Sequence, residues 1–172
     1  MNLLIGTGHF LSHFYMLCLP PLFVAWQQSF HVGYAALGLA VALLSAVTAI
    51  LQTPVGLLVD RYGARYFLIG GAAVMTLAIA AMGVAAEYWQ ILVLAILSGI
   101  GNSVIHPCNY AILSASVSSD RVGRAFSFHT FAGNLGFAAG PPVTIGLTLL
   151  LGWRGALAVV GMAGLPLVAS ML

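Results

Sequence analysis

Long apolar runs joined by short polar breaks dominate the chain. A helix needs about 20 apolar residues to cross the hydrocarbon core of a bilayer. The runs reach that length and are continuously apolar, which is too long and too uniform for the alternating strands of a membrane β-barrel. The pattern therefore predicts an all-α integral membrane protein. We expect one bundle over residues 1–172, with six transmembrane helices at 3–25, 35–58, 66–86, 88–115, 124–150 and 153–172.

The composition narrows the class of protein further. Hydrophobic residues make up 62% of the chain and charged residues 5%, whereas a soluble chain carries roughly 25% charged residues. The mean hydropathy is +1.08. So few charges exclude a soluble enzyme, a disordered chain and a secreted disulfide scaffold. The net charge of +2 rests on five arginines without a lysine, which is too little basic surface to expect a nucleic-acid partner.

The arginines are distributed unevenly between the two sides of the predicted bundle. Arg61 and Arg65 lie in the second connection and Arg121 and Arg124 in the fourth, and these connections share one side. The opposite side carries Arg154. Because arginine-rich connections stay in the cytoplasm, we expect a multi-pass protein of the plasma (inner) membrane with both ends of this chain cytoplasmic.

Aromatic residues gather near the predicted helix ends. Tryptophan and tyrosine side chains prefer the interface between lipid and water. We therefore expect an anchoring belt, rather than a binding cage, from Trp26, Tyr62, Tyr66, Tyr88, Trp89 and Trp153.

The connection between the second and third spans carries the most informative motif. Gly56 allows another backbone to approach the end of the second span, and Gly63 permits the positive φ that a tight turn often needs. Asp60 is bracketed by Arg61 and Arg65. This acid and its arginines can form a charge-assisted network that holds adjacent helices in one conformational state. The alternative is a tight turn with ordinary positive-inside charges.

This stretch, G-x-L-x-D-R-x-G-x-R, resembles the signature loop of the major facilitator superfamily. Ala64 stands where the family usually has a basic residue. Residues 136–142 are similar to the glycine–proline motif of the superfamily's exporters, and residues 152–154 to the G-W-R that often opens the sixth helix. The resemblance implies the N-terminal half of a twelve-span major facilitator fold, built from two inverted three-helix repeats. A C-terminal six-helix half is then expected as a missing partner.

A narrower likeness is to the fosmidomycin-resistance branch of this superfamily. It rests on His9-x-x-x-His13 in the first span, residues 102–107 in the fourth and residues 133–136 in the fifth. That branch has an acid at the second position of the first-span pair, where this chain has His13.

Four histidines lie deep in the predicted spans: His9, His13, His106 and His129. Imidazole titrates near neutral pH, and ionisable groups inside a membrane usually face a cavity or a partner. The histidines are therefore candidates for binding a proton or a substrate, with interhelical hydrogen bonds as the alternative. Asn102, one turn before His106, and Asn134 in the fifth span are further candidate cavity residues.

A metal site is a third interpretation of the first-span pair, because two histidines on adjacent turns can share an ion. No Cys, Asp or Glu stands near His9 and His13 in sequence to complete a coordination set. We therefore expect no metal site and no cofactor.

Small residues and prolines shape the fifth span. A stripe that suits close helix packing consists of Gly133, Gly136 and Gly140, in line with His129. Pro141 and Pro142 follow and interrupt the regular helical hydrogen bonds, which can bend the helix. In the exporters that the motif resembles, such a bend is thought to restrict leak through the cavity; a fixed kink is the alternative.

Together with the resemblance, these features predict a secondary active transporter of small molecules. The favoured hypothesis is a proton-coupled antiporter for efflux of a drug or metabolite by alternating access, of the kind that gives antibiotic resistance. Nutrient uptake by the same fold, and a six-span membrane assembly or sensor protein without transport, are the alternatives. The expected partners are a small-molecule substrate, a proton and the lipid bilayer. The sequence has no nucleophile–base pair and no phosphate-binding glycine loop in a suitable context, so we do not expect an enzyme.

Overall fold

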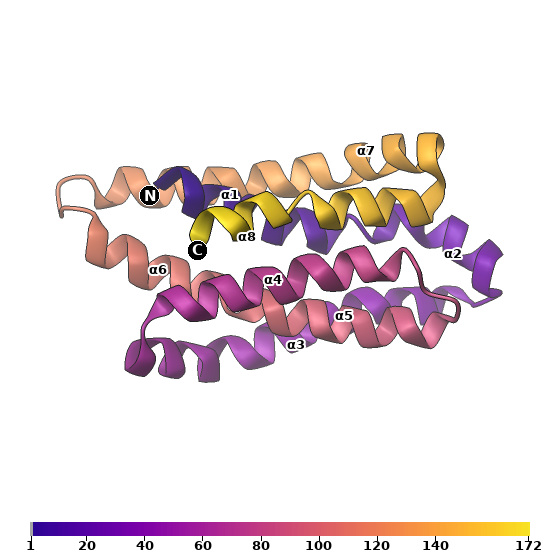
Figure 1. Ribbon diagram of the computed structural model, residues 1–172, viewed down its shortest axis with the longest axis horizontal. Helices are drawn as coiled ribbons and strands as arrows, with labels where there is room; N and C mark the ends of the chain where they lie inside the picture. The colour runs from indigo at the N-terminus through magenta and orange to yellow at the C-terminus, as the bar shows by residue number, and fades with distance from the viewer. Residues whose placement is uncertain (1) are drawn as a thin grey trace.

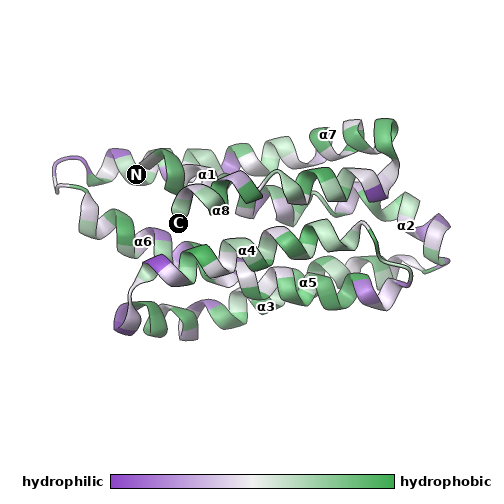
Figure 2. Ribbon diagram, viewed as in Figure 1, coloured by the Kyte–Doolittle hydropathy of each residue, from purple (hydrophilic) through white to green (hydrophobic). Residues whose placement is uncertain are grey.

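Every regular element within residues 2–172, the part of the chain that this computed structural model describes, is a helix (Figure 1). Apolar residues cover most of each helix, and many of the hydrophilic ones lie toward the ends of the bundle (Figure 2). In chain order the elements are α1 (Asn2–Leu17), η1 (Pro20–Leu22), α2 (Phe23–Phe30), α3 (Tyr34–Tyr62), α4 (Ala64–Met82), α5 (Tyr88–Ser103), α6 (Ile105–Ser116), α7 (Val122–Met162) and α8 (Leu165–Met171).

Within residues 2–172, five helical segments are long and apolar enough to cross a membrane: Leu3–Phe30, Tyr34–Tyr62, Ala64–Met82, Tyr88–Ser116 and Val122–Met171. The last segment makes two passages. Gly152 has φ 70° and ψ 169°, outside the helical region, and the chain reverses at this point within α7 (Figure 1). Only a residue without Cβ adopts a positive φ at little cost. The prediction of an all-α integral membrane fold is confirmed, with its last two passages joined through this glycine.

Prolines interrupt two of the passages. Pro20 and Pro21 separate α1 from α2, and the helix then continues to Phe30, beyond the predicted end at residue 25. Pro107 lacks the N–H that would bond the carbonyl of Ser103, and the fourth passage is divided next to it, between α5 and α6 at Val104. Both breaks follow from the missing backbone donor.

Glycines allow the helices to approach closely where they cross. A Cβ on Gly101 of α5 would lie 2.5 Å from the Gly71 oxygen and 2.5 Å from the Met75 nitrogen, both in the backbone of α4. A Cβ on Gly99 would lie 2.6 Å from the Leu44 oxygen of α3. Lipid tails are as apolar as the side chains, so helices in a membrane associate through close packing of their backbones rather than through the hydrophobic effect. The glycines of α5 therefore hold α3, α4 and α5 together.

An aromatic cluster closes one end of the bundle. The rings of Trp26 and Trp153 are 6.2 Å apart, and Phe30 lies 5.5 Å from Trp153 and 5.7 Å from Tyr88. Trp153 Nε1 donates to Ser29 Oγ at 3.0 Å. The expected interfacial belt is therefore wrong for Trp26, Tyr88 and Trp153, which are buried because they pack on one another rather than on lipid. Tyr62, Tyr66 and Trp89 are exposed, as an anchoring role requires.

We expect Trp153→Phe to lower the free energy of unfolding by about 1–2 kcal/mol, through loss of the bond to Ser29 and of part of the packed ring. Thermal unfolding of the purified protein in detergent measures the change. Trp89→Phe makes the same substitution at an exposed position and is the matched control. Equal melting curves for the two variants would show that the cluster does not stabilise this end of the bundle.

Candidate functional site: a buried histidine cluster

The four deep histidines meet at one place between α1, α6 and α7. His9 stacks on His129 with ring centroids 3.7 Å apart and an interplanar angle of 6°. The His13 ring lies 4.2 Å from the His9 ring, and the His106 ring 4.9 Å from it. His9 and His129 are only 4% and 2% exposed. The fold thus assembles one imidazole cluster, defined here as His9, His13, His106 and His129, whose outermost members are 120 positions apart in the chain.

The local sequence explains how three helices bring these rings together. His9 and His13 are one turn apart and share a face of α1. Gly133 of α7 lies opposite them: a Cβ there would come within 2.5 Å of His9 Cε1 and 3.0 Å of His13 Cε1. His106 follows the break at Val104 and begins the second half of the fourth passage. The small residue and the broken helix together provide the space for the cluster.

The hydrogen bonding fixes the state of one ring. His9 Nδ1 lies 2.7 Å from the backbone oxygen of His129. A carbonyl oxygen only accepts hydrogen bonds, so Nδ1 carries the proton and Nε2 presents a lone pair when the ring is neutral. Within residues 2–172, buried ring nitrogens without a hydrogen-bond partner are His9 Nε2, His13 Nδ1, His106 Nδ1 and both nitrogens of His129.

Other polar side chains surround the imidazole cluster. Ser12 Oγ, next to His13 in α1, donates to Asn102 Oδ1 of α5, so the amide oxygen of Asn102 has a hydrogen-bond partner. Asn109 is fully buried, and neither its oxygen nor its nitrogen has a partner among the described residues. Neither Ser12 nor Asn109 is among the candidate residues that the sequence predicts. The spacing of three residues from His106 to Asn109, on one helical face, is the signal that finds the latter.

The remaining fifth-span candidates divide between two faces of α7. Gly136 and Gly140 face α1, where a Cβ on Gly140 would lie 3.1 Å from the Phe14 oxygen. Asn134 is exposed, and its Nδ2 donates to the Thr130 oxygen at 3.0 Å. A step of five residues from His129 turns Asn134 well away from the cluster, so the structure does not bring it to the site. Pro141 and Pro142 lie inside α7 beyond the cluster.

The signature loop forms a tight turn between α3 and α4. Gly63 has φ 87°, the positive value that the motif predicts. Asp60, Arg61 and Arg65 are exposed, and Asp60 forms no ion pair with either arginine in this structure. Arg65 donates instead to the backbone oxygen of Leu172 at 2.8 Å. The predicted network of Asp60, Arg61 and Arg65 is therefore not formed in this structure. It stays a prediction for another conformational state.

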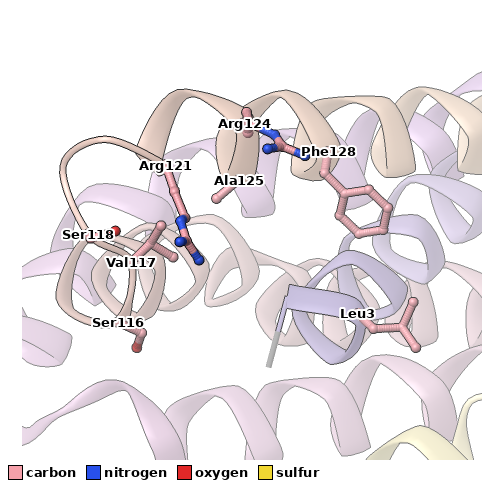
Figure 3. Close-up of a pocket in the computed structure, with 8 residues that line it drawn as sticks. All are labelled: Leu3, Ser116, Val117, Ser118, Arg121, Arg124, Ala125 and Phe128. Carbon is pink, nitrogen blue, oxygen red and sulfur yellow. The ribbon is translucent and has the colours of Figure 1, made fainter.

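A cavity of about 660 Å³ opens at the end of the bundle that carries the α6–α7 loop (Figure 3). Arg121 extends beside Val117, and Arg124 points along α7 toward Phe128. Arg121 Nε lies 3.5 Å from Asp120 Oδ2, the one ion pair found within residues 2–172. Arg124 therefore brings an uncompensated positive charge to the cavity. The lining comprises Leu3, Ser116, Val117, Ser118, Arg121, Arg124, Ala125 and Phe128.

A helical bundle with apolar spans and a buried polar cluster defines a polytopic membrane protein. The family model described as "Major Facilitator Superfamily" matches residues 5–172. The chain therefore belongs to the Major Facilitator Superfamily, a family of membrane transporters rather than enzymes.

Relatives and a solved structure agree with this assignment. The chain is 30% identical over 139 residues to a "Probable L-galactonate transporter" of Escherichia coli (strain K12), covering 81% of this chain and 31% of that protein. It is 35% identical over 98 residues to "Multidrug resistance protein MdtH" of Klebsiella pneumoniae (strain 342), covering 56% of this chain and 24% of that protein. The chain thus spans less than a third of the length of these two relatives.

The fold is also that of a bacterial homologue of the human lysosomal transporter Spinster, solved in an inward-facing and occupied conformation. The TM-score is 0.83 at 15% sequence identity, over 99% of this chain and 42% of that one. At this identity the likeness concerns the fold.

Proposed function

We propose that this chain is the N-terminal half of a proton-coupled secondary transporter that exports a small drug-like compound or metabolite by alternating access. The observation that carries the proposal is the imidazole cluster. It places four imidazole side chains, a residue type that can bind and release a proton, between three membrane-spanning elements, while the acidic and basic side chains of residues 2–172 lie near the helix ends. A site that takes up and releases protons in mid-membrane is what coupling to a proton gradient requires.

The proposed orientation rests on the arginines. The α3–α4 turn and the α6–α7 loop, with two arginines each, lie toward the same end of the bundle, at the left in Figure 1. Arg154 follows the turn at Gly152, at the opposite end. By the positive-inside rule, the first end and both termini of this chain face the cytoplasm of a cell bounded by the plasma (inner) membrane.

A second six-helix bundle would complete the transporter. The glycine–proline motif of α7 and the multidrug resistance relative support export as an antiporter. The mass of the native protein tests the first part of this proposal. A mass about twice the 17.9 kDa of this chain is expected for a chain of two bundles. A native protein of 17.9 kDa that stays monomeric in the membrane would contradict it.

Export with proton exchange is tested in inside-out membrane vesicles from cells that express the native gene. Respiration acidifies the vesicles and quenches a ΔpH-sensitive dye. Addition of ethidium, a probe for a multidrug exporter, should partly restore the fluorescence because protons leave as ethidium enters. If vesicles that contain the protein accumulate ethidium no faster than vesicles from empty-vector cells, the proposal of export for this class of compound is wrong.

We expect the double variant His9→Gln/His13→Gln to lose proton-coupled transport by at least about tenfold, because coupling between two ligands is worth 1–3 kcal/mol and both rings belong to the imidazole cluster. The measurement is the ethidium-dependent recovery of the ΔpH signal. His31→Gln, which changes an exposed histidine beyond α2, should keep the wild-type signal. An unchanged signal in the double variant would remove the histidines from the coupling mechanism.

Uptake of an organic anion is a second candidate function. The cavity with Arg121 and Arg124 offers positive charge at one end of the bundle, and a relative is named as a probable L-galactonate transporter. Uptake of radiolabelled L-galactonate into intact cells distinguishes the two candidates. Proton-driven accumulation that falls in Arg124→Gln, without ethidium export, would favour uptake over efflux.

A further inference from the structure

The imidazole cluster contains three ring nitrogens that lie close enough together to share a metal ion. One ring nitrogen from each of His9, His106 and His129 lies within 4.8 Å of the other two. The three side chains come from α1, α6 and α7, so no stretch of local sequence contains the set. Tetrahedral bonds of about 2.0–2.1 Å from an ion to imidazole nitrogen separate the nitrogens by about 3.3 Å. For both lone pairs to point at one ion, the stacked rings of His9 and His129 must also turn out of their parallel arrangement.

The hydrogen bonds around these rings prepare them for a cation. The donation from His9 Nδ1 to the His129 carbonyl, 2.7 Å long, orients the ring and leaves the Nε2 lone pair free. Metal-binding histidines almost always have such a bond on the nitrogen that does not bind the ion. His9 Nε2, His106 Nδ1 and both ring nitrogens of His129 are buried without a protein partner. Unpaired buried polar atoms are costly, and a shared cation satisfies three rings at once.

We propose that His9, His106 and His129 form a binding site for a divalent transition-metal cation of the Zn²⁺ or Co²⁺ type. Neutral imidazole suits zinc, copper, iron and nickel, whereas magnesium and calcium require oxygen ligands. No carboxylate joins the set among the described residues. The nitrogen-only donor set therefore selects the transition metals.

Three ligands leave one tetrahedral position open. The His13 ring flanks His9 at 4.2 Å but packs on Phe137, with ring centroids 4.1 Å apart, and it is not one of the three. The open position is available to water or to an exchanging ligand, in contrast to the four protein ligands of a closed structural site. The proposal concerns binding alone and does not depend on the direction or substrate of transport.

Spectroscopy of the purified protein in detergent tests the site without a transport assay. After removal of metals with a chelator, Co²⁺ is added alone and its visible absorption recorded. We expect an intense tetrahedral band that saturates at about one ion per chain and disappears when Zn²⁺ is added. X-ray absorption at the zinc edge should then count three imidazole nitrogens at about 2.0 Å. A weak octahedral spectrum, or oxygen ligands only, would overturn the proposal.

Substitutions assign the ligands. His106→Gln and His129→Gln should each weaken Zn²⁺ binding by at least about 100-fold, the upper range for loss of supporting residues around a metal. His31→Gln is the matched control at an exposed position and should bind as the wild type does. Equal affinity in all three variants would show adventitious binding elsewhere and refute the site. If a variant does not purify as a folded protein, the zinc-edge measurement on the wild type decides alone.

Discussion

Replacing Asp60 by Asn should reduce transport by roughly tenfold or more while leaving the protein folded and inserted in the membrane. In this structure Asp60 is exposed and unpaired with Arg61 and Arg65, so its loss removes no contact from this state. A charge-assisted bond formed only in the alternate state stabilises that state by about 1.5–3 kcal/mol. Its loss shifts the population between the two states by about tenfold or more. Transport rate in vesicles and the amount of protein in the membrane are the two measurements.

The chain supplies a matched control for this variant. Asp120 begins a second D-R-x-G sequence at the same end of the bundle and forms an ion pair with Arg121. The side chains of Asp120 and Arg121 are 70% and 76% exposed. Such surface pairs contribute little, so Asp120→Asn should transport at the wild-type rate. A similar loss in both variants would indicate a general effect of negative charge at this end. Wild-type rates in Asp60→Asn would exclude a conformational role for the signature acid.

Replacing Gly101 by Leu should prevent recovery of folded protein. The Cβ alone would meet two backbone atoms of α4 at 2.5 Å, and backbone does not move aside as a flexible side chain does. Overpacking of a well-packed core costs about 1–3 kcal/mol, and separation of two whole helices costs more. The fraction of monodisperse protein in fluorescence-detected size-exclusion chromatography measures the effect.

The same change at Gly70 is the control, because a Cβ there has nothing within 4 Å. Gly70→Leu should elute as the wild type does. A monodisperse Gly101→Leu protein would mean that α4 and α5 separate at low cost, and would contradict the role of glycine in this crossing.

The apolar runs were sufficient to predict the class of fold, because a membrane helix must satisfy its backbone bonds within a continuous apolar segment. The positive φ at Gly63 also followed from local chemistry. Burial could not be predicted in the same way. Trp26 and Trp153 carry the composition of interfacial anchors, yet they are buried against each other. Local sequence does not specify which face of a helix meets another helix rather than lipid.

The candidate site shows the same limit more strongly. His9 and His129 are 120 positions apart, and only the packing of α1 on α7 makes them neighbours. From the sequence, His9 and His13 form a pair without a third ligand, which is why no metal site was expected. Asn134 illustrates the same limit, since a position next to Gly133 in sequence lies on another face of the helix and outside the imidazole cluster. Tertiary packing, and not residue type, decides membership of the imidazole cluster.

The interruption at Val104 has a mechanical consequence. It divides the fourth passage into two helices, α5 and α6. The first of them, α5, is fixed to α3 and α4 by close glycine contacts. The second helix, α6, has 12 residues. His106 lies near its N-terminus, and the loop that carries Arg121 follows its C-terminus. A helix bends most readily where its ladder of hydrogen bonds is broken. If α6 rotates about Val104, a displacement of the surface loop changes the spacing between His106 and the other imidazole rings.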